Sequence, residues 1–244
     1  MLTFCSWDNI YNRELQNHAE DDDDEGTLWF SESNAEEAIL QQLASLCSVG
    51  HLRRRSEDDE DPPKAASRFL DLGTGNGHML FRLRAPDEED LTWDGELVGI
   101  DYSEASVSLA RRIEVQKFNN GAEDSTSMRF EHWDLLREQP GNWLSDGFDA
   151  VLDKGTFDAI SLMQHDGGPD HPCQVYREKV VSLIKPGGFL LVTSCNWTKQ
   201  ELLQWLAPPN GDLVYFDEAD YPTFSFGGQT GQTIVTIVFR KNAS

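Results

Sequence analysis

Acidic side chains stand at the ends of three short apolar runs that follow one another along the chain. Asp71 lies near the end of the first run, Asp101 ends the second, and Asp134 follows the third. Short apolar runs without polar alternation predict buried strands of a parallel sheet. Because ligands of such sheets bind beyond the carboxyl ends of the strands, we expect the three carboxylates to contact one ligand.

A glycine-rich loop begins two residues after Asp71, with glycine at positions 73, 75 and 77. Such a turn from a strand into a helix lets ligand atoms approach the backbone at the helix N-terminus. The dinucleotide-binding fingerprint would place its third glycine where His78 stands, and a carboxylate at 71 would repel a pyrophosphate. Asp71 instead suits a ligand with an ammonium group. The loop residues that we expect to contact this ligand are Gly73, Thr74 and Gly75.

S-adenosylmethionine has the groups that this arrangement predicts: an amino acid end, a sulfonium cation, a ribose and an adenine. Asp101, with Tyr102 beside it, holds the position that binds ribose hydroxyls. Asp134, with Leu135 beside it, could accept a hydrogen bond from the adenine amino group. The three acids in this order therefore favour a methyltransferase.

The pattern from residue 68 onward alternates between short apolar runs and helical stretches, which predicts a Rossmann-like α/β fold with helices on both faces of the sheet. The expected parallel strands are Phe69–Leu72, Leu97–Ile100, Met128–Phe130, Phe148–Leu152 and Phe189–Thr193. The expected helices include Gly77–Arg84, Ser103–Phe118, Pro172–Ile184 and Thr198–Leu206. The runs Leu213–Phe216 and Thr233–Phe239 leave no room for a helical crossover between them, so they should form an antiparallel hairpin. Seven strands result.

The N-terminal third of the chain has a different organisation. Residues 1–52 contain one predicted helix, Asn34–Leu46, with Asn34 as its N-cap and Glu37 at the capping-box position. Residues 53–67 predict an acidic linker or insertion, and residues 68–244 form the main domain.

The net charge of −23 limits the classes of partner. Three runs, 20–25, 57–61 and 87–90, hold 15 of the 43 acidic residues, so we expect solvated acidic loops. This balance argues against a nucleic-acid partner. The sequence has no apolar segment of membrane-spanning length and no visible signal peptide, and its four cysteines form no Cys-x-x-Cys pair. We therefore expect a cytoplasmic protein without a membrane partner, and a monomer.

Several strings of the sequence carry a resemblance to a known family: 71–77, 99–103, 153–162 (DKGTFDAISL), 194–198 (SCNWT) and 224–228, together with Trp7, Tyr11 and Trp29-Phe30. They resemble those of the elongation factor 1-alpha lysine methyltransferases, which are seven-strand (class I), S-adenosylmethionine-dependent enzymes of the eukaryotic cytoplasm. The resemblance extends from Trp7 to Phe239, and Ser31 departs from it because the family tends to have glycine there. The acidic stretches 57–61 and 87–90 and the loop 167–172 look like insertions.

The resemblance implies methylation of a lysine of elongation factor 1-alpha, with S-adenosylhomocysteine as the product. Asp153, at the end of the fourth strand, is where this superfamily usually meets its substrate, and we assign it to holding the lysine amine by a hydrogen bond. The alternative is that Asp153 caps the turn into a helix at Thr156. Lys154 is expected to be a solvated turn residue. Methyl transfer by in-line displacement requires no metal.

Aromatic residues near the N-terminus could form a lid over the cofactor or only fasten the N-terminus to the sheet. We expect Trp7, Trp29 and Phe30 to contact the cofactor. Tyr11, together with Asn196 and Trp197 after the fifth strand, is expected to contact the substrate. The residues leave other functions open: a methyltransferase acting on another protein or a small molecule, or a partner protein that binds S-adenosylmethionine without reacting.

Overall fold

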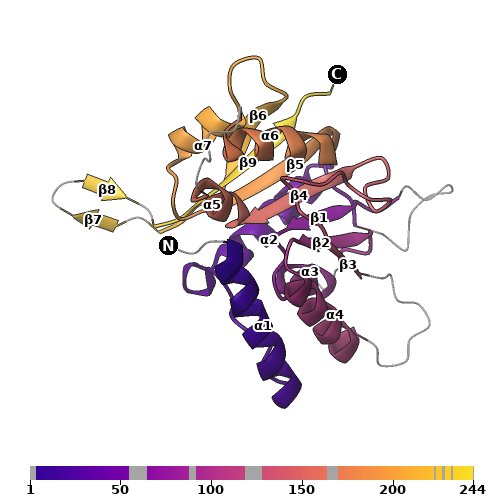
Figure 1. Ribbon diagram of the computed structural model, residues 1–244. Helices are drawn as coiled ribbons and strands as arrows, with labels where there is room; N and C mark the ends of the chain where they lie inside the picture. The colour runs from indigo at the N-terminus through magenta and orange to yellow at the C-terminus, as the bar shows by residue number, and fades with distance from the viewer. Residues whose placement is uncertain are drawn as a thin grey trace.

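A seven-stranded sheet forms the centre of the protein (Figure 1). The computed structural model describes residues 4–54, 65–87, 92–118, 128–163, 170–222, 224–226, 229–231 and 233–243. The strand order is β3-β2-β1-β4-β5-β9-β6. The strands are β1 (Phe69–Leu72), β2 (Leu97–Asp101), β3 (Met128–His132), β4 (Phe148–Lys154), β5 (Ile184–Ser194), β6 (Leu213–Glu218) and β9 (Val235–Lys241).

The pairing directions agree with the fold class expected from the sequence. The first five strands are parallel, and β9 pairs antiparallel with both β5 and β6. The antiparallel pairing predicted for the last two apolar runs is therefore confirmed. A small hairpin that the sequence analysis did not predict, β7 (Phe224–Phe226) with β8 (Gln229–Gly231), precedes β9 and projects away from the sheet in Figure 1.

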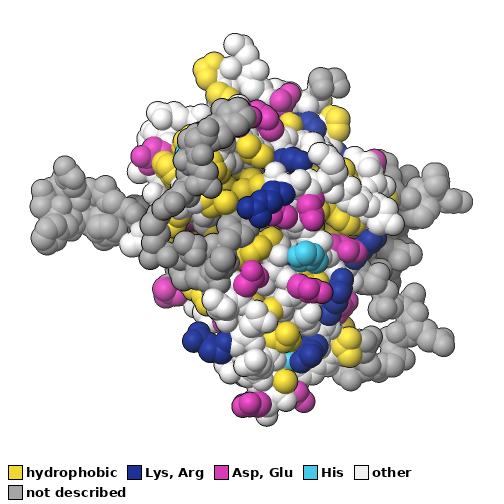
Figure 2. All heavy atoms as spheres, viewed as in Figure 1, with side chains coloured by type: hydrophobic (Ala, Val, Ile, Leu, Met, Phe, Trp, Pro, Cys, Tyr) yellow, Lys and Arg dark blue, Asp and Glu magenta, His cyan; other side chains and the backbone are white. Residues whose placement is uncertain are grey.

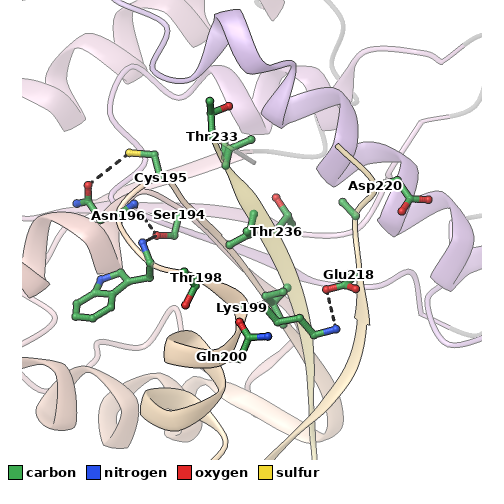
Figure 3. Close-up of a pocket in the computed structure, with 15 residues that line it drawn as sticks. Ser194, Cys195, Asn196, Thr198, Lys199, Gln200, Glu218, Asp220, Thr233 and Thr236 are labelled. Carbon is green, nitrogen blue, oxygen red and sulfur yellow. Dashed lines mark hydrogen bonds and ion pairs between the residues drawn. The ribbon is translucent and has the colours of Figure 1, made fainter. Parts of the chain in front are cut away.

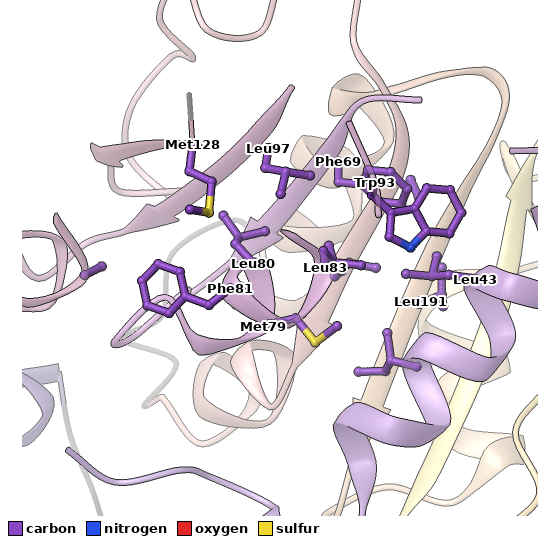
Figure 4. Close-up of a cluster of buried hydrophobic side chains, with 14 of the residues drawn as sticks. Leu43, Phe69, Met79, Leu80, Phe81, Leu83, Trp93, Leu97, Met128 and Leu191 are labelled. Carbon is purple, nitrogen blue, oxygen red and sulfur yellow. The ribbon is translucent and has the colours of Figure 1, made fainter. Parts of the chain in front are cut away.

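Two layers of helices cover the two faces of the sheet, because successive side chains of each buried strand point to opposite faces. On one face, Phe69 and Leu97 pack with side chains of α2, α3 and α4 (Figure 4). On the other, Leu70 and Val98 share a cluster with α5, α6 and α7. The helices are α1 (Phe4–Glu20), α2 (Ala35–Ser48), α3 (His78–Arg84), α4 (Glu104–Phe118), α5 (Thr156–Ser161), α6 (Pro172–Leu183) and α7 (Lys199–Leu206).

The N-terminal segment differs from its prediction in two respects. It contains α1 as well as α2. Trp7, Tyr11 and Leu15 recur at helical spacing along α1 and pack against the core, a signal that the sequence analysis did not use. The capping box predicted at Asn34 is wrong: Asn34 has a left-handed backbone (φ 54°), and its side chain makes no capping hydrogen bond. Glu37 instead contacts Gln41 and Arg82. The capping box at Thr198 and Glu201, in contrast, is present.

The acidic runs are partly paired where the structure describes them. Glu25 forms an ion pair with Lys117, and Asp87 forms one with Arg54. Residues 57–61 and 88–90 lie outside the described residues. Figure 2 shows basic side chains interspersed with acidic ones on the face in view. Across the described ranges, no helix is long and apolar enough to cross a membrane.

Helix α2 belongs to the same core as the sheet, and this generates the first prediction. Leu43 is fully buried against the sheet. Leu43→Ala should lower the free energy of unfolding by about 2–5 kcal/mol, because it leaves a cavity in a packed core. Chemical denaturation measures the change. Val115→Ala on α4, where the side chain is 56% exposed, is the control and should change stability by less than about 0.5 kcal/mol. Wild-type stability of Leu43→Ala would show that α2 is not part of the cooperative core.

Candidate active site

The glycine loop forms the floor of the site between β1 and α3. Gly73, Gly75 and Gly77 all have positive φ angles between 59° and 83°, which L side chains rarely adopt. At all three positions the space is also occupied, at Gly77 by the rings of Phe81 and Phe130. A Cβ on Gly73 would lie 2.2 Å from Oγ1 of Thr156, and one on Gly75 would lie 2.6 Å from the hydroxyl oxygen of Tyr11. The loop therefore needs glycine for its conformation and for its neighbours.

Asp71 is buried below this loop. Its side chain is 3% exposed, and its Oδ2 accepts a hydrogen bond from the Thr74 hydroxyl at 2.8 Å. Burial raises the pKa of Asp71 to about 7, against the opposing effects of the Thr74 hydrogen bond and of the charge on Lys154. A cationic group placed beside Asp71 would stabilise the carboxylate and lower this pKa.

Asp101 connects the second strand to the glycine loop. Its Oδ2 accepts a hydrogen bond from the Gly75 amide at 3.1 Å, and its Oδ1 accepts one from the Ser103 amide at 2.9 Å. Each carboxylate oxygen can accept a further hydrogen bond, so Asp101 can still bind hydroxyl groups. Burial raises the pKa of Asp101. Asp134, after β3, accepts hydrogen bonds from the amides of Leu136 and Arg137.

A cavity of about 560 Å³ brings these carboxylates together. Every residue predicted to contact the cofactor lines it, and so do Tyr11 and Asn196 from the predicted substrate set. The predicted residues in its wall are Trp7, Tyr11, Trp29, Phe30, Asp71, Gly73, Thr74, Gly75, Asp101, Tyr102, Asp134, Leu135 and Asn196. Tyr11 lies against Gly75, on the cofactor side of the cavity, where the sequence analysis did not place it.

The N-terminal aromatics cover this cavity. The rings of Trp7 and Trp29 meet edge to face, with their centroids 4.8 Å apart. Phe30 packs on the backbone of Gly155, where a Cβ would come within 2.7 Å of the ring. The same side chains line the cavity and attach the N-terminal segment to it. The two roles that we considered from the sequence, a lid and an attachment of the N-terminus, are therefore performed by the same residues.

Asp153 lines neither this cavity nor the one described next. Its side chain is fully buried on the other side of β4. It accepts a hydrogen bond from the Tyr176 hydroxyl at 2.5 Å and further ones from the amides of Thr156 and Phe157 at the start of α5. Burial raises the pKa of Asp153 to about 7. These contacts do not support the prediction that Asp153 holds the substrate amine, and they match its alternative, a cap on the turn into α5.

A second cavity of about 420 Å³ adjoins the first beyond the end of β5 (Figure 3). The two cavities share Cys195 and Asn196 in their walls, and Trp197 lines the second cavity only. Lys199 and Glu218 form an ion pair of 2.9 Å at its rim. Of the predicted substrate residues, Asn196 thus lies in the wall of both cavities, and Trp197 lies in the wall of the second.

Sequence reasoning assigned no role in the site to Asp158, which lies in the wall of the first cavity and is 5% exposed. Its carboxylate accepts hydrogen bonds from the Ser194 hydroxyl at 2.5 Å and from the Cys195 amide at 2.9 Å. Burial raises the pKa of Asp158, and these hydrogen bonds oppose the shift. The signal in the sequence was its position on the first turn of the helix after the fourth strand.

Comparisons with known proteins agree with this geometry. A family model described as "Methyltransferase domain" matches residues 63–237. The "Protein-lysine N-methyltransferase efm4" of Schizosaccharomyces pombe is 40% identical over 98% of this chain and 92% of its own length. The "EEF1A lysine methyltransferase 2" of Danio rerio is 35% identical over 96% of this chain and 85% of its own.

A solved structure with the same fold is that of N-methyltransferase NodS from Bradyrhizobium japonicum WM9 in complex with S-adenosyl-L-homocysteine. It superposes with a TM-score of 0.54, covering 95% of this chain and 98% of that one, at 14% identity. At this identity the likeness concerns the fold alone.

Asp71 generates a prediction about the pH dependence of cofactor binding. Because its pKa is about 7 in the absence of ligand, the carboxyl must lose a proton to pair with an ammonium group. The affinity for S-adenosylhomocysteine should therefore fall by up to about tenfold per pH unit as the pH is lowered from 7 to 5.5. Calorimetry measures it. Asp71→Asn should bind more weakly with little pH dependence over this range, and a flat wild-type profile would contradict the assignment.

Asp153 generates a prediction about stability. Its pKa is about 7 in the folded state, whereas the ordinary value for an aspartate is 3.8. Between pH 3.8 and 7 the folded state therefore holds a proton that the unfolded state has lost. Stability contributed by this group is therefore lost as the pH rises from about 4 to 7. Asp153→Asn cannot ionise. Denaturation of both proteins at pH 4.5 and 7.5 should show the wild type losing stability relative to the variant. Parallel profiles would mean that the Asp153 carboxyl ionises normally.

Proposed function

Because the chain belongs to the family of S-adenosylmethionine-dependent protein-lysine N-methyltransferases, we propose that it methylates a lysine of translation elongation factor 1-alpha. The observation that carries the proposal is the pair of joined cavities: one has carboxylates for a cofactor with an amino acid end and a ribose, and the other opens beside it for a polypeptide. Two relatives, matched over nearly the whole chain, have names that give the reaction, and one of these names gives the protein acted on.

The residues of the first cavity fit the cofactor. The carboxylate of Asp71 would take the ammonium group, Asp101 the ribose hydroxyls and the Asp134 turn the adenine. The indole Nε1 of Trp29 is buried with no acceptor among the described residues, which fits a cover that closes on a ligand with acceptor groups. When bound, S-adenosylmethionine supplies a methyl group activated by the sulfonium. The aromatic cover of Trp7 and Trp29 excludes water from it.

The target lysine must reach the cofactor as a neutral amine, whereas its ordinary pKa is about 10.4. We place its entry at Cys195 and Asn196, where the second cavity joins the first. The first cavity is lined by Trp7, Trp29 and Phe30, and apolar surroundings of this kind disfavour the ammonium form. Asp158 faces this passage and accepts from Ser194 and Cys195, so it, rather than Asp153, is the carboxylate that can receive a hydrogen bond from the amine.

An elongation factor acts in the cytoplasm, and we place the protein there. We propose that it works as a monomer, as expected from the sequence.

The test is methylation of purified elongation factor 1-alpha by the purified protein, with the modified lysine located by mass spectrometry. Asp158→Asn should lower turnover by about 100-fold, because misplacing the nucleophile is costly, and should leave the affinity for S-adenosylhomocysteine within about threefold. Failure of the wild type to methylate the factor would remove it as the substrate.

Ser194→Ala is the matched control for Asp158. It removes the hydrogen bond at Oδ1 but leaves the carboxylate in place. If Asp158 only supports the loop after β5, the two variants should lose turnover equally. A much larger loss for Asp158→Asn is the result that the proposed contact with the amine requires.

A further inference from the structure

We infer that Lys154 binds the carboxylate of the cofactor's amino acid end, in a subsite formed with the N-terminal cover. The inference rests on the proposed function, because it takes S-adenosylmethionine as the cofactor. It assigns to Lys154 a role that the sequence did not suggest and that neither the relatives' names nor the matched family description contain.

Lys154 is not the solvated turn residue that we expected from the sequence. It is the last residue of β4, and its side chain is only 15% exposed. Since side chains alternate along a strand, it points away from the face on which Asp153 meets Tyr176. Its ammonium group lies in the wall of the first cavity.

The partners of Lys154 come from the N-terminal segment. Its Nζ donates a hydrogen bond to the Trp29 carbonyl oxygen at 3.1 Å and lies 3.6 Å from Oε1 of Glu36. Glu36 is also bound to Nδ1 of His78 at 2.8 Å, so its charge is shared between two partners. An ammonium has three N–H groups, and these contacts use one of them in a hydrogen bond and one at most in the longer ion pair. Lys154 can therefore still donate to a ligand.

The charges around the cavity point to this lysine as the partner of a carboxylate. Asp71 and Lys154 are close enough for the lysine charge to lower the pKa of Asp71. In an amino acid the ammonium and carboxylate groups are attached to the same carbon atom, so their two binding groups must also be neighbours. The pair Asp71 and Lys154 has the matching charges.

The other cation in the cavity wall is placed elsewhere. Arg137 is 77% exposed and pairs with Asp134 at 3.6 Å, at the end where we place the adenine. It follows β3, which is separated from β1 by β2 in the sheet, so it is not placed to serve a carboxylate that lies next to Asp71. His78, also in the wall, is occupied by Glu36.

The N-terminal cover gives a second reason to expect that a ligand places a hydrogen-bond acceptor near Lys154. Trp29, whose carbonyl oxygen binds Lys154, has a buried Nε1 without an acceptor among the described residues. Phe30 lies next to it, with its ring centroid 6.0 Å from Nζ of Lys154. A carboxylate held by Lys154 would bring an acceptor to this cover, and cofactor binding would then fasten residues 29–30 in place.

The experiment compares two ligands, S-adenosylhomocysteine and its decarboxylated analogue, by calorimetry on the full chain. Lys154→Met should bind S-adenosylhomocysteine at least tenfold more weakly, because it loses a charge-assisted hydrogen bond. It should bind the decarboxylated analogue within about twofold of the wild type. Lys154→Arg should recover most of the affinity for S-adenosylhomocysteine. Lys179→Met on α6, where the lysine contacts the Glu138 carbonyl, is the control and should bind both ligands normally.

The comparison of the two ligands separates ligand contact from support of the cover. If Lys154 only fastens the N-terminal segment, Lys154→Met will lower the affinity for both ligands by the same factor. That result would overturn the assignment of Lys154 to the carboxylate and would leave the proposed function standing. A wild-type protein that binds neither ligand would overturn the cofactor assignment and this inference together.

Discussion

The parallel pairing of β1 with β2 on one side and β4 on the other is the constraint on which the site depends. It places Asp71 beside Gly99 and Leu152, so the loop after β1 lies between the ends of both neighbours. Gly75 can then donate to Asp101, and Thr156 can pack on Gly73. β1 and β2 are buried on both faces, and the polar residues Asp71 and Asp101 lie at their carboxyl ends, where a ligand can reach a parallel sheet.

Burial of charge gives this edge its chemistry. Asp71 and Asp153 end adjacent strands, and burial raises both pKa values to about 7, but they face different surroundings. Asp153 is satisfied by Tyr176 and two amides of its own chain. Asp71 has one hydroxyl partner and faces a cavity. A buried carboxyl whose partners are incomplete is suited to a cationic ligand, whereas one whose partners are complete supports the fold.

The N-terminal segment completes the site from outside the sheet. Residues 27–36 pass over the cavity, and two of them, Phe30 and Asn34, have left-handed backbones without being glycine. This strain is maintained by contacts of the segment with Gly155 and Lys154. The cover is thus attached at the end of β4, on the side of that strand opposite to Asp153. At the end of β4, Asp153 therefore supports α5, and the next residue, Lys154, supports the cover.

The sequence by itself determined which runs form parallel strands and which pair antiparallel, and it placed Asp71, Asp101 and the glycine loop at one cavity, because strand periodicity and the glycine loop are local signals. The sequence analysis did not recognise α1, although Trp7, Tyr11 and Leu15 have helical spacing. It also did not predict the backbone at Asn34, which ends the turn Ser31–Ser33 in the left-handed region instead of capping α2 with its side chain. It also could not decide between Asp153, Lys154 and Asp158. Asp153 and Lys154 end β4, and Asp158 follows it in α5. Which of them meets the cavity depends on the direction of each side chain and on partners as distant as Trp29, Tyr176 and Ser194. Only tertiary packing fixes those contacts.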